Sequence, residues 1–177
     1  MGTKLVALIR GINVGRAKRV AMADLRALME SLGYGDPRTL LNSGNIVFTA
    51  GRCDPSRVGV RIERAMSAKL GVSARVIVLT AADFSTVVRE NRLSEVAADP
   101  TRLLVAFLSE PADRVRLEPL ARQDWKPERL ALGTRAAYLW CPAGMIESRL
   151  AQAVGRILGD ATTTRNWATV TKLHALL

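Results

Sequence analysis

The feature that most constrains the fold of this chain is the order of its strand and helix patterns, which occurs twice. Between residues 4 and 79, apolar runs predict strands and apolar residues at helical spacing predict helices. Their order is β-α-β-β-α-β followed by an extra helix, and the same order returns after residue 102. Each pass matches the split βαβ arrangement of a ferredoxin-like plait. The sequence therefore predicts an α+β protein with two tandem ferredoxin-like (βαββαβ) plaits packed into one compact body.

In the first pass, start and stop residues mark the predicted elements. Asp54 and Pro55 suit the beginning of a helix, and Gly33 suits the end of one. Thr80 and Asp83 have the spacing of a helix capping box. The predicted strands are Leu5–Ile9, Thr39–Leu41, Ile46–Thr49 and Arg75–Leu79, and the predicted helices are Ala21–Gly33, Asp54–Leu70 and a short helix from Thr80.

In the second pass the patterns are similar, and Gly133 with Thr134 suits a hairpin turn. Pro119 should interrupt or kink a helix predicted for Pro111–Arg122, because proline lacks the N–H that a helix interior needs. A further helix is predicted from the spacing of Ile146, Leu150, Val154 and Ile157, and a last helix from Asn166 onward. The predicted strands are Leu103–Leu108, Glu128–Leu132, Ala136–Trp140 and Ala161–Thr164.

These patterns divide the chain into two domains. Residues 1–91 form the first plait with its extra helix, and residues 103–177 form the second plait with a C-terminal helix. Residues 92–102, which contain Asp99 followed by Pro100, are the predicted linker.

The formal net charge of +10, from 26 basic and 16 acidic residues, favours polyanion binding. The basic residues are spread over both halves, however, and most are arginines in an alanine-rich chain. A compositional habit of the source explains such a balance equally well. A basic module that associates with nucleic acid is therefore an alternative to a small-molecule site.

The sequence favours a cytoplasmic protein without membrane contact. No apolar run reaches the roughly 18 uncharged residues of a membrane span. The N-terminal apolar run lacks the length and cleavage site of a signal peptide. Cys53 and Cys141 are far apart and have no Cys-x-x-Cys spacing, which fits a reducing compartment.

Several segments of the sequence resemble the bacterial family called domain of unknown function 1697. They are ALIRGINVG at 7–15, MADLRALMESLGY at 22–34, LNSGNIVF at 41–48, YLWCPAG at 138–144 and TRNWATVTKL at 164–173. The segments are spread over nearly the whole chain. The resemblance implies a cytoplasmic bacterial protein built from duplicated α-β plaits, and it implies no activity.

The first candidate site is the turn that follows the apolar strand Leu5–Ile9. Arg10 and Asn13 precede Gly15, and Arg16, Lys18 and Arg19 follow it. Two glycines followed by basic residues suggest an anion site, but neither the P-loop nor the dinucleotide fingerprint is present. Asn13 is also a residue type that commonly hydrogen-bonds its own turn.

Two further polar segments complete the predicted site. The turn Asn42, Ser43, Gly44 and Asn45 offers one hydroxyl and two amides, or it simply satisfies its own backbone. The other segment contains Arg165, Asn166 and Lys172, with Arg165 and Lys172 expected near the N-terminal end of the last helix, where the dipole favours an anion. We expect the polar turns to form an anion or ligand site at the junction of the two plaits.

Catalysis and cofactors receive little support from the sequence. The chain has one histidine and two separated cysteines, which cannot make a zinc site, and no calcium loop occurs. Ser43 lacks a nucleophile elbow, so it is not expected to be a nucleophile. We expect no cofactor and no metal. An enzyme acting on a phosphorylated or nucleotide-like metabolite is the alternative to a binding protein.

Overall fold

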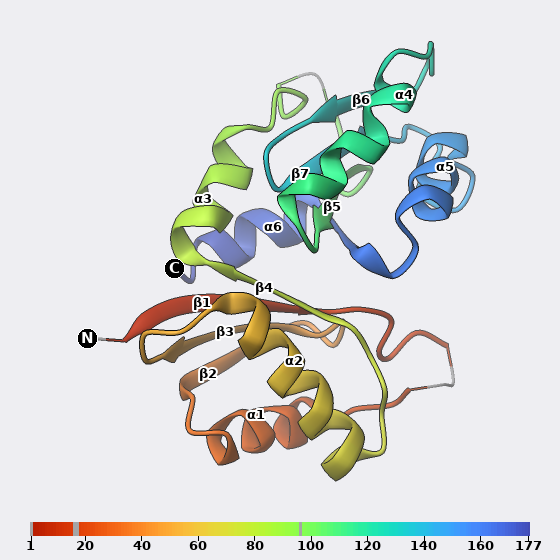
Figure 1. The fold of residues 1–177 in the computed structure, drawn as a ribbon. Coiled ribbons are helices and arrows are strands. Elements are labelled where there is room, and N and C mark those ends of the chain that lie inside the picture. Colours follow the sequence, from red (N-terminus) through yellow and green to blue (C-terminus); the bar gives the residue numbers. More distant parts are fainter. Residues whose placement is uncertain (1, 16–17, 96) are drawn as a thin grey trace. The chain divides into compact units, whose positions relative to one another are not determined.

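The computed structural model describes residues 2–15, 18–95 and 97–177 (Figure 1). The described part contains two four-stranded antiparallel sheets and six α-helices, so the fold belongs to the mixed α+β class. The chain divides into two units. The first unit ends at Phe84 and includes Leu176–Leu177, and the second spans Ser85–Ala175. None of the helices in the described ranges is long and apolar enough to cross a membrane.

The sheet of the first unit has the strand order β2-β3-β1-β4, with every neighbouring pair antiparallel. Its strands are β1 Thr3–Ile9, β2 Gly35–Leu40, β3 Asn45–Ala50 and β4 Val76–Thr80. The last five residues of β1 are buried, as the unbroken apolar run predicts for a strand covered on both faces.

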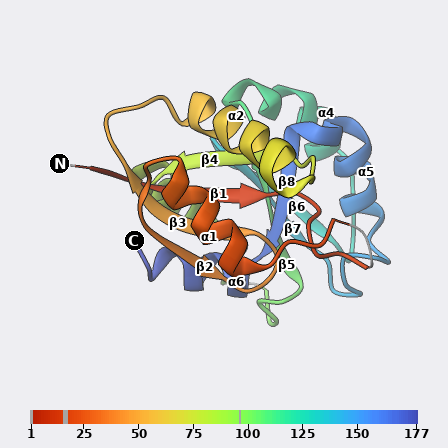
Figure 2. The same cartoon turned by 90° about the horizontal axis from the view of Figure 1, so that it is seen from below.

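Two helices pack on one face of this sheet. Figure 1 and Figure 2 show α1 (Met22–Ser31) and α2 (Pro55–Ala65) on the same side of it. Alternate residues of β1, such as Leu5 and Ile9, share a core with Leu25 of α1 and Ile62 of α2. The apolar stripes of both helices therefore face the sheet, as their spacing predicts.

The ends of α2 agree with the predicted signals. The N–H of Ser56 donates to the Asp54 carboxylate over 2.9 Å, and Pro55 occupies the first turn. The helix continues as a π-helical turn, Met66–Leu70, before Gly71 ends it with φ of 64°. A left-handed residue of this kind is a common helix terminus, and glycine adopts it without a steric penalty.

The sheet of the second unit has the order β6-β7-β5-β8, again antiparallel throughout. Its strands are β5 Leu103–Leu108, β6 Arg129–Leu132, β7 Ala136–Trp140 and β8 Thr162–Asn166. Counted from the first strand of each sheet, this is the strand order of the first unit. The repeated pattern in the sequence is thus a repeated strand order in space.

Several helical segments accompany the second sheet. They are α3 Ala81–Arg89, which contains the boundary between the units, the 3-10 helix η2 Pro111–Leu117, α4 Glu118–Ala121, α5 Arg149–Leu158 and α6 Trp167–His174. Leu104 and Leu108 of β5 share a core with Leu117, Leu120 and Val154, so η2, α4 and α5 cover the same face of this sheet.

The interruption predicted near Pro119 is present, whereas the predicted start of the next helix was wrong. Pro111–Arg122 is a 3-10 helix followed by one α-helical turn, and the change occurs after Leu117 and before Pro119. Pro119 lies in the first turn of α4, where its missing N–H is not needed. Ile146 is outside α5 and 86% exposed, because Ser148 caps the helix and α5 begins at Arg149.

The length of the first edge strand, β2, was also underestimated. The sequence predicted a strand over Thr39–Leu41, whereas β2 begins at Gly35 and pairs with β3 through an irregular register between Gly35 and Arg38. Half of β2 is exposed, so its residues do not alternate as those of a half-buried strand do. The two units of the structure are divided between Phe84 and Ser85. The predicted domain limits, with a linker at 92–102, stay a prediction.

Candidate functional site

The turn after β1 is held in shape by the side chain of Asn13. This residue has a left-handed φ of 55°, which asparagine tolerates better than most residues. Its amide nitrogen donates to the carbonyl oxygens of Val20 and Asn42, both over 2.8 Å, and its amide oxygen accepts from the N–H of Val20 over 2.9 Å. Asn13 therefore joins the turn to the start of α1 and to the turn between β2 and β3.

The turn between β2 and β3 packs closely against the end of β1. Gly44 has a φ of 80°, and its carbonyl oxygen accepts from the N–H of Ile9 over 2.8 Å. A Cβ atom at position 44 would lie 2.8 Å from Cβ of Ile9, so only glycine fits there. The buried amide of Asn45 donates to the Leu40 carbonyl and to Ser43 Oγ, both over 2.9 Å.

These contacts bring the two predicted polar turns of the first unit together at one corner of its sheet. We call this corner the first corner: the described residues 10–15 and 18–21 after β1, and the turn from Leu41 to Asn45. It contains a cavity of about 350 Å³ lined by Asn13, Arg19, Val20, Ala21, Met22 and Asn42. Arg19, one of the basic residues that follow Gly15 in the predicted anion site, supplies the cationic side chain of the lining.

The cavity lies at the N-terminus of α1. The N-cap position is occupied by Ala21, which has extended backbone angles and no side-chain oxygen to accept from the helix. The first N–H groups of a helix have no partner within the helix, and they carry a partial positive charge. With Arg19 beside them, these groups favour an anion.

Arg10 and Lys18, two further predicted residues of the first unit, form main-chain hydrogen bonds. The N–H of Arg10 donates to the Arg75 carbonyl over 2.9 Å, which continues the pairing of β1 with β4. The carbonyl of Lys18 accepts from the N–H of Asn13 over 3.0 Å, and its side chain is exposed. Arg16 lies outside the described residues.

The predicted residues of the second unit are in three different settings. Arg165 lies on β8 and is 9% exposed, and burial lowers the pKa of its guanidinium to about 10. Its Nη1 donates to Thr163 Oγ1 and to the Thr164 carbonyl. Asn166 is the N-cap of α6 and accepts from the N–H of Thr169 over 2.9 Å.

Lys172 is exposed in the last turn of α6, so placing it near the N-terminal end of the helix was wrong. The helix has eight residues, and position 172 is its sixth. The expected convergence of these residues with the polar turns of the first unit stays a prediction.

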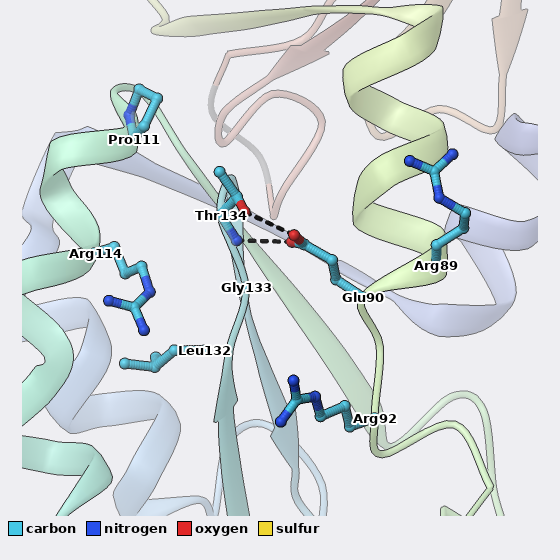
Figure 3. A pocket seen from close by; sticks show the side chains of 8 residues that line it. All are labelled: Arg89, Glu90, Arg92, Pro111, Arg114, Leu132, Gly133 and Thr134. Carbon is cyan, nitrogen blue, oxygen red and sulfur yellow. Dashed lines mark hydrogen bonds between the residues drawn. The ribbon is translucent and has the colours of Figure 1, made fainter.

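A second cavity, of about 540 Å³, was not predicted from the sequence (Figure 3). It lies beside the turn between β6 and β7 and is lined by Arg89, Glu90, Arg92, Arg114 and Thr134, among others. The lining residues come from three separate stretches of the chain. Their arginines could not be distinguished in the sequence from the other arginines, which are spread evenly. The turn residues Gly133 and Thr134 indicated the hairpin but not the cavity.

The described residues show little that supports nucleophilic or metal chemistry. Within the described ranges no three His, Cys, Asp or Glu side chains gather where a metal ion would be held. Burial raises the pKa of the Cys141 thiol to about 11, so this thiol is poorly nucleophilic at neutral pH. Nε2 of His174 lies 3.1 Å from Ser85 Oγ, both in the second unit.

The model of one protein family matches residues 2–138; its description is "Protein of unknown function (DUF1697)". Among solved structures, the conserved bacterial protein SP0830 from Streptococcus pneumoniae is similar, with a TM-score of 0.80 and 23% sequence identity over 99% of each chain. At this identity the likeness supports the fold alone. No functionally curated protein matches the chain. The family match covers most of the chain, and the chain therefore belongs to the DUF1697 family of proteins of unknown function.

Proposed function

We propose that this protein binds a small anionic ligand at the first corner. The observation that carries the proposal is the cavity in which Arg19 lies next to the N-terminus of α1. Backbone N–H groups at a helix start and a nearby guanidinium are a common combination for phosphate or carboxylate groups. The cavity volume of about 350 Å³ suits a small metabolite.

The hydrogen bonds of Asn13 support this proposal by fixing the walls of the cavity. Because Asn13 holds Val20 and Asn42 in place, the corner is formed before a ligand arrives. A preformed site spends less of its binding free energy on ordering loops. The predicted residues Asn42, Ser43 and Asn45 then act mainly by shaping the corner, whereas Arg19 and Lys18 supply charge.

Both units are proposed to be ferredoxin-like plaits. Their common strand order and antiparallel pairing support this assignment, as does the position of α1 and α2 on one face of the first sheet. In such a fold, the loop after the first strand and the turn between the second and third strands lie at the same end of the sheet, which is where the cavity occurs.

A thermal-shift titration tests the proposed ligand site. Sugar phosphates and nucleoside monophosphates are added at constant ionic strength, and a ligand that binds the folded state raises Tm by mass action. The double variant Lys18→Gln/Arg19→Gln should lose most of that increase. Arg52→Gln is the matched control, because Arg52 is an exposed arginine of the same unit outside the cavity. An increase that persists in the double variant would reject the first corner as the site.

A further inference from the structure

We infer that the second unit contains a separate site for a phosphorylated small molecule. The site is the cavity beside the turn between β6 and β7, where three arginines, Arg89, Arg92 and Arg114, line one hollow (Figure 3). This inference goes beyond the ligand proposed at the first corner, because it concerns other residues in the other unit.

The two cavities occupy equivalent places in the repeated strand order. The first cavity lies where the connection after β1 meets the turn between β2 and β3. The second lies where the connection after β5, represented by Pro111 and Arg114, meets the turn between β6 and β7. Arg89 at the end of α3 and Arg92 in the segment after it add a third wall to the second cavity. The same corner of the repeated architecture is therefore hollow and basic in both units.

A carboxylate fixes the turn at the centre of the second cavity. Glu90 Oε2 accepts from the N–H of Thr134 over 2.7 Å, and Oε1 accepts from the Thr134 hydroxyl over 2.6 Å. Burial by itself raises the pKa of Glu90, but these hydrogen bonds and the charges of Arg89 and Arg92 lower it overall. Glu90 thus stays ionised and uses both oxygens on the turn.

Position 133 of the turn has no room for a residue larger than glycine. A Cβ atom at this position would lie 2.7 Å from Glu90 Oε2 and 3.0 Å from the Tyr138 hydroxyl oxygen. The Tyr138 hydroxyl in turn donates to the Val87 carbonyl of α3 over 2.6 Å. The hairpin is therefore hydrogen-bonded to Val87 of α3 and to Glu90, the residue directly after α3.

The arginines outnumber the carboxylate by three to one in the lining of the cavity. Arg114 pairs with Glu118 over 2.9 Å, and Arg89 donates to Thr86 Oγ1 over 2.8 Å. Each of these contacts uses one guanidinium nitrogen, and a guanidinium has five N–H donors. In Figure 3, Arg92 and Arg114 extend toward the hairpin, whereas the guanidinium of Arg89 points away from it. Arg92 and Arg114 are thus the better placed pair.

The chemistry of this lining identifies the ligand class. Arginine forms paired, charge-assisted hydrogen bonds with phosphate oxygens, and two or three guanidinium groups match the charge of a phosphate dianion. Pro111 and Leu132 add apolar surface on which the organic part of a phosphorylated molecule can lie. The volume of about 540 Å³ has room for both parts.

Isothermal titration calorimetry of the full chain with inorganic pyrophosphate, at constant ionic strength, tests the inference. The expected result is saturable binding that weakens at least tenfold in the double variant Arg92→Gln/Arg114→Gln. Arg122→Gln is the matched control, because Arg122 is an exposed arginine of the second unit outside the cavity, and its affinity should change less than about twofold. Unchanged circular dichroism and urea midpoints show that the variants fold.

Three results would overturn the inference. The first is the absence of saturable pyrophosphate binding, and the second is an equal loss of affinity in Arg92→Gln/Arg114→Gln and in Arg122→Gln. The third is tighter binding of an oligothymidylate, with every exposed arginine contributing equally to the affinity. The last two describe a diffuse basic surface. The variant Lys18→Gln/Arg19→Gln separates this inference from the first-corner proposal, because it removes only a site in the first unit.

Discussion

Single residues determine the shape of the first corner, and Asn13 is the most important of them. It makes three side-chain hydrogen bonds while its backbone has a left-handed φ. We predict that Asn13→Ala lowers the free energy of unfolding by about 3 to 4 kcal/mol, since the three hydrogen bonds contribute about 1 kcal/mol each and alanine disfavours this φ by about 1 kcal/mol. Urea denaturation measures the change.

Two companion variants separate the causes. Asn13→Gly removes the hydrogen bonds but accepts the φ, so it should destabilise the protein less than Asn13→Ala. Asn42→Ala should change the free energy by less than about 0.5 kcal/mol, because Asn42 contributes its main-chain oxygen to the contact with Asn13. Equal losses for Asn13→Ala and Asn42→Ala would show that the side chain of Asn13 has no special part.

The two cysteines differ in reactivity because one is exposed and the other is buried. Burial raises the pKa of Cys141 to about 11, so at pH 8 its thiolate is scarce, whereas Cys53 is accessible. We predict that Ellman's reagent titrates one thiol quickly in the folded protein and two in urea. Fast reaction of both thiols in the folded protein would contradict the buried setting of Cys141.

The same pKa shift has a defined effect on stability. The unfolded thiol loses its proton near pH 9, and the folded thiol keeps it to about pH 11. The folded state therefore holds more protons between these values, and the contribution of Cys141 to stability is lost as the pH rises through them. Cys141→Ala should remove this part of the pH dependence.

At the level of elements, the attachment of α3 to the second sheet depends on the hydroxyl of Tyr138. This hydroxyl donates to the Val87 carbonyl from a fully buried position, and burial raises the pKa of Tyr138. We predict that Tyr138→Phe lowers the free energy of unfolding by about 1 to 2 kcal/mol, because a buried carbonyl loses its donor. Urea denaturation at neutral pH measures this loss. A variant as stable as the wild type would mean that water replaces the hydroxyl.

Elements with strong local signals could be predicted from the sequence, and elements with weak signals could not. The cap of α2 at Asp54 and the Thr80 and Asp83 pair before α3 both occur as expected, because capping hydrogen bonds depend on residues a few positions apart. Edge strand β2 and the start of α5 were placed incorrectly. An exposed apolar residue such as Ile146 misleads the periodicity analysis, because that analysis assumes that apolar residues face the core.

At the level of the whole molecule, the repeat of strand order explains why the two cavities have matching positions. The sequence predicted the polar turns of the first corner but neither cavity. Cavities form between segments that are distant in the chain, such as Arg92 and Thr134, and their side chains meet only after the sheet has formed. Asn45 and Arg165 were also predicted as site residues because they are polar. Both are buried within the fold.

We propose that the first corner and the second cavity both bind anions. Titration of ¹⁵N-labelled protein with ribose 5-phosphate, followed by two-dimensional amide NMR at constant ionic strength, tests both sites at once. We predict saturable shifts confined to the start of α1 around Met22 and to the cavity around Arg92 and Thr134. Small shifts spread evenly over exposed basic residues, or no shifts at either site, would contradict anion binding.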